Sequence, residues 1–397
     1  MRLALALAAL GRGRTHPNPR VGAVAVLGGR PVGLGAHLRF GGPHAEAALL
    51  ESMPPDVLGG STVYVNLEPC AHHGKTPPCA PSLARSGVAR VVAAIEDPDP
   101  RVRGRGFAEL RRVGIEIEIG PLARAARRLN APFLGWHARR RSWVTLKLAT
   151  TLDGRIAATD GSSRWISSSR TRERVHRWRA GSDAILVGRG TWFTDRPRLT
   201  ARPTRDPQAK LRARLGGSPN WPPQPVRVVV DSSCRTGASE EMQAHIAACP
   251  GGRWVFACGH MAPEARRKRL EALGAQCWVL PDTGGGAGVD LSALMTRLGE
   301  EGLLDVFVEG GAALATGLIS AGLVDSLRLV VAPALLGGER IWTRDLGIRS
   351  IEDKLRWGRL RARRIGRDVL ITGLSPAAEV LLSGRTEATE GTPCSRG

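Results

Sequence analysis

The sequence predicts a two-domain α/β protein. Its 397 residues exceed what one compact core of ordinary size holds. Short apolar runs alternate with helical patterns in both halves of the chain, and this alternation predicts helices layered on β-sheets. A hydrophobic fraction of 42% and a charged fraction of 23% allow packed cores and exclude general disorder.

Residues 1–141 carry the first set of elements. The opening MRLALALAAL runs into GRGRTHPNPR without a usable cleavage site, so it predicts a first helix rather than a signal peptide. Strands are predicted from VGAVAVL (21–27), TVYVNL (62–67), RVVAAI (90–95) and GIEIEIG (114–120). Helices are predicted from HAEAALLES, APSLARSG and GFAELRRVG. Residues 121–141 predict a helix and a basic connector, which places the domain boundary near residue 142.

Residues 142–375 predict a second α/β domain. Its strands are predicted from SWVTLKLAT (142–150), DAILVG (183–188), VRVVVD (226–231), RWVFAC (253–258), DVFVEGG (305–311) and SLRLVVAP (326–333). Residues 201–225, rich in Pro and Arg, predict an exposed insertion loop, and the triplet Gly284, Gly285 and Gly286 predicts another loop. Residues 376–397 lose the periodic pattern, so we predict a disordered tail.

The net charge of +21 raises the question of nucleic-acid binding. Only five of the 57 basic residues are lysine, and the arginines are spread along the whole chain, which weakens that interpretation. Arginine also binds phosphate in a bidentate manner, so a phosphorylated small substrate explains part of the excess equally well.

The seven cysteines are scattered and odd in number, which does not resemble a disulfide framework and predicts a reducing compartment. No stretch approaches the ~18 consecutive apolar residues of a membrane span. We therefore expect a cytoplasmic protein.

A metal site is predicted from four residues of the first domain. GPHAEAALL places His44 and Glu46 at the start of a helix, and LEPCAHHGKTPPCAPSLARSG supplies Cys70 and Cys79. A catalytic zinc takes three protein ligands and leaves its fourth position to water, a requirement that one His and two Cys satisfy. Zinc lowers the pKa of that water, and a neighbouring carboxylate can move its proton to a leaving amine, the role expected of Glu46. The combination is typical of zinc deaminases.

Other interpretations of these residues stay open. A His-x-Glu pair occurs often by chance, and two cysteines alone are more often small buried hydrophobic residues. His72 and His73, close to Cys70, are rival ligands. A closed four-ligand site containing one of them leaves no position for water and no role for Glu46.

Four stretches of the first domain also match a known family: RTHPNPRVGAVAV, HAEAALL, NLEPCAHHGKTPPCAPSLARSGVARVVAAIEDPDPRVRGRG and LNAPFLG. They resemble the deaminase half of the bifunctional riboflavin biosynthesis deaminase/reductase. The resemblance implies a cytidine-deaminase-like domain in which His44, Cys70 and Cys79 hold zinc and Glu46 shuttles the proton. It also implies that Asn18 contacts the substrate, with a turn residue between two prolines as the alternative.

The second domain continues the resemblance in LKLATTLDGRIA, GSSRWIS, SDAILVGRGTWFTDRPRLTAR, VRVVVDS and VFVEGGAALATGLISAGLVDSLRLVVAPALLGG. These stretches resemble the reductase domain of the same enzyme, whose fold is similar to dihydrofolate reductase. The resemblance implies an NADPH site built from Ala149, Trp165, Thr191, Asp195, Ser232, Gly311, Ala312, Ala313, Leu314, Ala315, Thr316 and Gly317. It also implies that a phosphoribosyl substrate is bound by Ser163, Arg179, Leu199, Arg202 and Glu309.

The residue types give partial independent support. Arg179 and Arg202 suit a 5-phosphate, although exposed surface arginines are the alternative. Lys147 is a candidate for polarising the reducing centre, and an exposed lysine at a strand end is its alternative. Gly310 and Gly311 follow a strand and precede a helix start, where backbone N–H groups can bind phosphate. They lack the Gly-x-Gly-x-x-Gly spacing of a dinucleotide site.

Arg196 departs from the pattern of the family, which usually has an acidic or amide residue directly after the position of Asp195. A cation there can pair with Asp195 or crowd the substrate phosphate. An impaired or altered reductase is therefore an alternative.

We expect a bifunctional enzyme of riboflavin synthesis. Residues 1–141 are expected to deaminate 2,5-diamino-6-(5-phosphoribosylamino)pyrimidin-4(3H)-one with Zn²⁺, and residues 142–375 to reduce the ribosyl group to ribityl with NADPH. The family also implies a homo-oligomer. The alternatives are a nucleic-acid base deaminase, a deaminase with an altered reductase half, and a non-enzymatic homologue that retains zinc.

Overall fold

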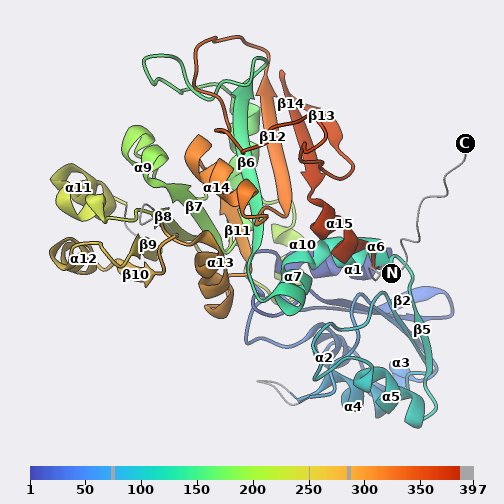
Figure 1. Cartoon of the computed structure of the whole chain (residues 1–397). Coiled ribbons are helices and arrows are strands. Elements are labelled where there is room, and N and C mark those ends of the chain that lie inside the picture. Colours follow the sequence, from blue (N-terminus) through green and yellow to red (C-terminus); the bar gives the residue numbers. More distant parts are fainter. Residues whose placement is uncertain (73–76, 250, 284–287, 385–397) are drawn as a thin grey trace, which may run out of the picture. The chain divides into compact units, whose positions relative to one another are not determined.

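The computed structural model describes residues 1–72, 77–249, 251–283 and 288–384. The chain forms two compact units (Figure 1). The first comprises Met1–Arg139, Pro207–Trp221 and the described residues from Ala377 onward, and the second comprises Arg140–Asp206 and Pro222–Pro376. The junction between Arg139 and Arg140 lies near the boundary predicted at residue 142.

The first unit is built on a five-stranded sheet in the order β2-β1-β3-β4-β5. β1 pairs antiparallel with β2 and β3, and β3, β4 and β5 are parallel. The strands are β1 (Gly22–Leu27), β2 (Arg30–Ala36), β3 (Thr62–Val65), β4 (Arg90–Ala93) and β5 (Glu116–Ile119). The helices are α1 (Arg2–Ala8), η1 (Ala9–Gly11), α2 (Ala45–Glu51), α3 (Pro55–Leu58), α4 (Cys79–Ala84), α5 (Arg105–Arg112), α6 (Ala123–Leu129), α7 (Ala131–Arg139), α10 (Ala209–Arg214) and α15 (Pro376–Ser383).

Two glycines allow helices to lie directly on this sheet. A Cβ on Gly22 of β1 would stand 2.2 Å from the Ala4 carbonyl oxygen of α1, and one on Gly35 of β2 would stand 2.0 Å from the Ala45 oxygen of α2. Neighbouring residues of a strand point to opposite faces, and Ala36 packs with α1 while Gly35 contacts α2. The close approach at Gly35 brings the first turn of α2, with Glu46, onto the sheet.

The second unit is built on a nine-stranded sheet in the order β10-β9-β8-β7-β11-β6-β12-β14-β13. Its strands run parallel from β10 to β12, and β14 and β13 continue the sheet in antiparallel pairs. The strands are β6 (Trp143–Thr151), β7 (Ala184–Gly188), β8 (Val226–Val230), β9 (Trp254–Gly259), β10 (Gln276–Leu280), β11 (Asp305–Val308), β12 (Ser326–Ala332), β13 (Arg361–Ile365) and β14 (Asp368–Leu374). The helices are α8 (Ser169–Ala180), α9 (Arg189–Asp195), η2 (Arg235–Ala238), α11 (Glu240–Ala247), α12 (Glu264–Glu271), α13 (Leu291–Glu300) and α14 (Ala312–Ser320).

Apolar clusters cover both faces of the parallel strands. Leu186 of β7 packs in one cluster with Leu298 of α13 and Leu318 of α14. Its neighbour Ile185 packs in another with Trp192 of α9 and Ile246 of α11. Strands buried on both faces have continuous apolar sequences, and these apolar runs allowed the strands to be predicted from the sequence.

Two sequence predictions about the connecting segments are wrong. Residues 201–225 are not simply an exposed loop, because 207–221 belong to the first unit and Arg212 of α10 is only 4% exposed. The tail is not disordered at its start, because α15 forms there and buries Ala378 and Leu382. The predicted loop at Gly284–Gly286 and the tail beyond residue 384 lie outside the described residues.

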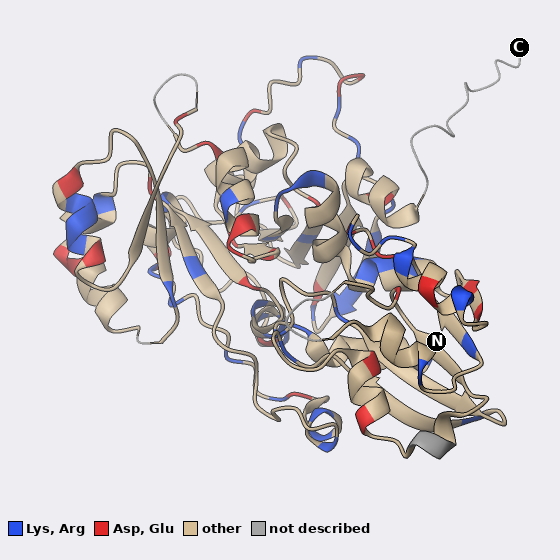
Figure 2. Ribbon diagram, turned by 90° about the horizontal axis from the view of Figure 1, so that it is seen from below, with Lys and Arg blue, Asp and Glu red and all other residues tan. Residues whose placement is uncertain are grey.

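Basic residues are dispersed on the fold. Figure 2 shows Lys and Arg on helices, strands and loops of both units, with Asp and Glu among them. The described part of the chain contains no helix long and apolar enough to cross a membrane.

Candidate active sites

Three potential metal ligands converge in the first unit. His44 is the N-cap of α2, Cys79 begins α4, and Cys70 lies in the loop after β3. His44 Nδ1 is 3.5 Å from Cys70 Sγ and 3.4 Å from Cys79 Sγ, and the three atoms lie within 4.8 Å of one another. Tetrahedral zinc, with Zn–S about 2.3 Å and Zn–N about 2.0 Å, holds N and S ligands about 3.5 Å apart. The donor set and its spacing therefore fit zinc.

The two thiols differ in proton affinity. The pKa of Cys70 is lowered to about 4, because the Cys79 thiol donates to its thiolate and because His44 and the Cys79 backbone N–H also lie against its sulfur. The pKa of Cys79 is raised, because its proton is shared with Cys70 and its side chain is buried. A divalent cation replaces such a shared proton, since metal ligation requires thiolates.

Glu46 lies beside this cluster in the first turn of α2 and is only 3% exposed. Burial raises its pKa to about 7, and the Cys70 thiolate contributes in the same direction, against the lowering effect of His44. A carboxyl group that titrates near neutrality can both accept and return a proton.

The rival ligands fall outside this cluster. His72 is not part of the metal-type group found among the described residues. His73 lies outside the described residues.

Asn18 is held by a histidine that the sequence did not single out. Buried His37 donates from Nδ1 to the Pro43 carbonyl oxygen at 2.7 Å, so its Nε2 accepts from Asn18 Nδ2 at 3.2 Å. Burial lowers the pKa of His37 to about 4, which keeps the ring neutral and this pattern intact. The contact directs the amide N–H₂ of Asn18 to His37 and leaves its oxygen as the acceptor. The His37 ring centroid lies 5.3 Å from that of His44, which places Asn18 close to the metal ligands.

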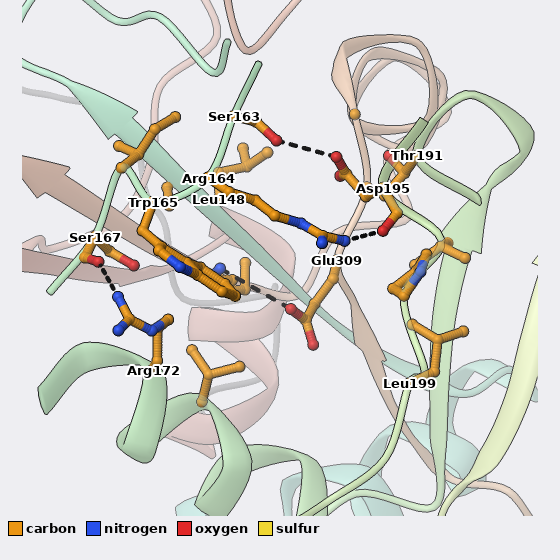
Figure 3. A pocket seen from close by; sticks show the side chains of 18 of the residues that line it. Leu148, Ser163, Arg164, Trp165, Ser167, Arg172, Thr191, Asp195, Leu199 and Glu309 are labelled. Atoms are coloured by element: carbon orange, nitrogen blue, oxygen red, sulfur yellow. Dashed lines mark hydrogen bonds and ion pairs between the residues drawn. The ribbon is translucent and has the colours of Figure 1, made fainter. Parts of the chain in front are cut away.

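The second unit contains a cavity of about 590 Å³ at the carboxyl ends of β6, β7 and β11 (Figure 3). Open parallel sheets bind ligands at these ends. Of the predicted residues, the cavity lining includes Lys147, Ala149, Ser163, Trp165, Arg179, Thr191, Asp195, Leu199, Arg202, Glu309 and Gly311. Its volume is in the range of small-molecule sites, so it can accommodate a cofactor or a sugar phosphate.

A buried ionic network lies at the base of the cavity. The Glu309 carboxylate accepts from Arg179 and lies 3.9 Å from Lys147 Nζ. Burial alone would raise the pKa of Glu309, but Arg179 and Lys147 together lower it. Burial lowers the pKa of Lys147, and Glu309 opposes this effect. The network holds the Lys147 amine beside a carboxylate inside the cavity.

The rim of the cavity carries polar and aromatic groups (Figure 3). Ser163 donates to the Asp195 carboxylate at 3.0 Å, and Arg164 donates to the Asp195 backbone oxygen. Trp165 is 66% exposed, and the Arg172 guanidinium lies 4.5 Å from its ring centroid. The basic side chains of the lining exceed the acidic Asp195 and Glu309, which suits an anionic ligand; they are Lys147, Arg164, Arg172, Arg179, Arg196, Arg198 and Arg202.

Arg196 does not neutralise the carboxylate of Asp195. Its guanidinium forms an ion pair with Glu241 of α11, while Asp195 accepts from Ser163. Arg196, the residue that differs from the family pattern, therefore has its ion-pair partner on α11.

Some residues of the predicted NADPH site do not line this cavity. Among the described residues that line the cavity, Ser232 and residues 312–317 do not occur. Ser232 follows β8, and residues 312–317 are the first turns of α14, directly after Gly311. Leu314 and Ala315 are packed in the core, so only their backbone can face a cofactor.

Several side chains at these sites were missed from the sequence. Glu68 accepts four backbone N–H groups, from Asp97, Gly104, Gly106 and Phe107, and so ties the loop before α5 to the Pro69–Cys70 stretch. His37, Glu68, Arg164, Arg172, His176 and Arg198 carried no local signal beyond ordinary polar positions. The nearest signals were the Gly-rich segment before His44 and the acidic run EDPDP.

Comparisons with known proteins agree with this architecture. The family model described as RibD C-terminal domain matches residues 142–371, and that of the cytidine and deoxycytidylate deaminase zinc-binding region matches residues 1–95. The chain is 36% identical to riboflavin biosynthesis protein RibD of Aquifex aeolicus, with 94% of this chain and 96% of that protein covered. It is 39% identical to RibD of Escherichia coli, with 94% and 97% covered.

Solved structures show the same relationship. Acinetobacter baumannii RibD matches with a TM-score of 0.80 at 32% identity. A Thermotoga maritima protein, described as a diaminohydroxyphosphoribosylaminopyrimidine deaminase/5-amino-6-(5-phosphoribosylamino)uracil reductase, matches with a TM-score of 0.78 at 29% identity. Each comparison covers 94% of this chain and 97% of the other. The resemblance read from the sequence and the predicted fold class are thus confirmed, and this chain belongs to the RibD family of riboflavin biosynthesis proteins.

Proposed function

We propose that this chain deaminates 2,5-diamino-6-(5-phosphoribosylamino)pyrimidin-4(3H)-one with its first unit and reduces the ribosyl group of the product to ribityl with its second. The cofactors of the two family regions are zinc and NADPH. The observation that carries the proposal is Glu46, a buried carboxyl with a pKa of about 7 beside a His-Cys-Cys ligand set.

For the deamination, His44, Cys70 and Cys79 would hold zinc, which when bound acidifies a water ligand and so supplies a nucleophile at neutral pH. Glu46 accepts a proton from the attacking water and delivers it to the departing amine, so that ammonia leaves and a carbonyl replaces the amine. Asn18, with its amide fixed by His37, presents its oxygen to the N–H groups of the substrate ring.

For the reduction, NADPH when bound supplies a hydride to C1′ of the ribosyl group. The bond from C1′ to the ring oxygen breaks, and that oxygen takes a proton and becomes a ribityl hydroxyl. Lys147 is the proton donor that the cavity offers, because burial lowers its pKa and Glu309 orients it. Arg179 and Arg202 bind the 5-phosphate.

The test is a two-stage assay on the zinc-loaded full chain with the diaminopyrimidine substrate. Ammonia release is followed first without NADPH, and NADPH oxidation is followed after its addition. Glu46→Gln is expected to lower ammonia release by about 10²- to 10⁴-fold. Exposed Glu51 lies on the same helix, so Glu51→Gln is the matched control and is expected to retain activity.

The outcomes separate the alternatives. Ammonia release without NADPH oxidation would confine the activity to the first unit and leave an altered reductase, with Arg196 as the first position to revert. A zinc-loaded protein that releases no ammonia from this substrate would contradict the proposal and leave the nucleic-acid base deaminase. The dispersed basic residues of Figure 2 do not favour that alternative.

We also infer a cytoplasmic enzyme that self-associates. All cysteines in the described part of the chain are free thiols, as a reducing compartment requires. Light scattering on the purified protein measures the oligomeric state.

A further inference from the structure

A segment from the reductase half of the sequence is part of the first unit. Residues 207–221 lie in the sequence between α9 and β8, two elements of the second unit, yet they pack with Met1–Arg139. The segment contains α10 (Ala209–Arg214), which ends in a turn at Gly216, where φ is +77°.

Three contacts fix the segment to the first unit. Arg212 is 4% exposed and donates from Nε to the Leu10 carbonyl oxygen at 3.2 Å. Leu215 packs against the apolar cluster that contains Leu10. From the other side, Arg14 donates to the backbone oxygen of Asn220.

Leu10 and Arg14, which make these contacts, are connected to Asn18 by the packing and hydrogen bonds of the 11–18 loop. Gly11, next to Leu10, packs so tightly that a Cβ on it would stand 2.6 Å from the His37 oxygen and 2.6 Å from the Thr15 side chain. The backbone N–H of Asn18 donates to the Thr15 oxygen at 2.8 Å, and its amide contacts His37.

A second route passes through the stretch after β2. The Phe40 N–H donates to the Arg14 oxygen at 2.8 Å, and Leu38 lies against Gly217 of the segment. Residues 11–18 and 37–40, which carry Asn18 and His37, are thus both supported by residues 207–221.

We propose that residues 207–221 are a working part of the deaminase site, in which Arg212 positions the 11–18 loop and so sets Asn18 for substrate binding. This proposal rests on the assignment of Asn18 to the substrate made under the proposed function. Arg212 is a positioning residue, because it acts through Leu10 and the loop. The reductase half of the sequence therefore contributes to the specificity of the other reaction.

The experiment is Arg212→Ala in the full-length chain. We expect the KM for ammonia release to rise about tenfold, because small displacements of a positioning group weaken binding strongly. The kcat is expected to change less, because His44, Cys70, Cys79 and Glu46 keep their places, and the zinc content per chain should stay unchanged. NADPH oxidation with the substrate already deaminated is an internal control and should be unchanged.

Matched variants sharpen the result. Arg214→Ala, an exposed arginine on the same helix, should leave both activities unchanged. Arg212→Lys retains a donor for Leu10 and should recover part of the lost affinity. If Arg212→Ala does not fold, Leu215→Ala removes a second contact of the segment and should raise the same KM.

A double-mutant cycle with Asn18→Ala tests the route. If Arg212 acts through Asn18, Arg212→Ala should add little to the KM of the Asn18→Ala protein. Independent, multiplicative effects, an unchanged KM, or equal losses in both activities would overturn the positioning role. An unchanged KM in Asn18→Ala alone would instead overturn the substrate assignment of Asn18, and with it this route.

Discussion

Asp97 and Asp99 stand two residues apart in the run EDPDP, and folding shifts the pKa values of their carboxyl groups in opposite directions. Burial raises the pKa of Asp97 to about 7, despite a hydrogen bond from the Asp99 N–H. Arg101 donates to Asp99 and lowers its pKa to about 2. Folding therefore favours a proton on Asp97 and removes one from Asp99.

This difference predicts opposite effects of pH on two variants. Asp97 in the unfolded chain loses its proton near pH 3.8, while the folded chain holds it to about 7, so its stabilising contribution falls as pH rises through this window. Asp97→Asn should have little effect on the unfolding free energy below about pH 4 and should stabilise by a few kcal/mol, at most about 4, at pH 8. Denaturant titrations of the zinc-loaded protein measure this.

Asp99→Asn provides the control. Its carboxylate contributes stability that is present above its unfolded pKa of 3.8 and is lost as pH falls toward about 2. Asp99→Asn should therefore destabilise at pH 8. Two variants that respond to pH in the same direction would contradict this account.

The sequence identified the residues that form patterns and missed those that depend on the fold. His44, Cys70, Cys79 and Glu46 follow a ligand spacing that chemistry restricts, and the structure brings them together. His37 has no such spacing. Its contact with Asn18 exists because Gly11 lets the 11–18 loop lie against the end of β2, and no local pattern reports that approach.

The N-terminal end of α5 packs against the Pro69–Cys70 stretch, which carries one of the predicted zinc ligands. Glu68 accepts N–H groups of Gly104, Gly106 and Phe107, which holds this end against the Pro69–Cys70 stretch. A Cβ on Gly106 would lie 2.0 Å from the Pro69 carbonyl oxygen, which is backbone and cannot rotate away. The close contact requires glycine.

Gly106→Ala is therefore expected to push α5 away from Cys70. We predict a loss of about 1–3 kcal/mol in the unfolding free energy, as in other overpacked sites, together with weaker zinc binding. Calorimetry and competition with a zinc-binding dye measure the two effects. The helical Gly190 has open space around its Cβ position, so Gly190→Ala should leave zinc binding unchanged. Equal zinc affinity in Gly106→Ala and the parent would contradict the role of α5.

Most strands with an apolar run were predicted, but β10 (QCWVL) and β14 (DVLITGL) were missed, as were two strands with little apolar pattern. All ten predicted strand segments form strands. β2 (RPVGLGA) was missed because it contains Pro and two Gly, residues depleted in strands. It forms because Gly28 and Gly29 adopt positive φ in a two-residue hairpin turn and because Gly35 lets α2 approach. β13 (RARRI) is exposed along most of its length and depends on pairing with β14.

Two units in one chain predict separable responses to metal removal. Chelation should unfold or loosen only the first unit, because His44, Cys70 and Cys79 all belong to it. In calorimetry one of two transitions should move to lower temperature and return when zinc is restored. NADPH oxidation with the deaminated substrate should survive chelation. A shift of both transitions would contradict the assignment of zinc to the first unit alone.

The helix α15 packs into the first unit, although it is the last helix in the described part of the chain. It buries Ala378 and Leu382, and Gly384 lies against Arg127 of α6. On the ribosome this helix is synthesised after the whole second unit. The first unit therefore lacks α15 until synthesis of the second unit is finished. A premature stop codon near residue 375 would therefore damage the half of the enzyme that was translated first.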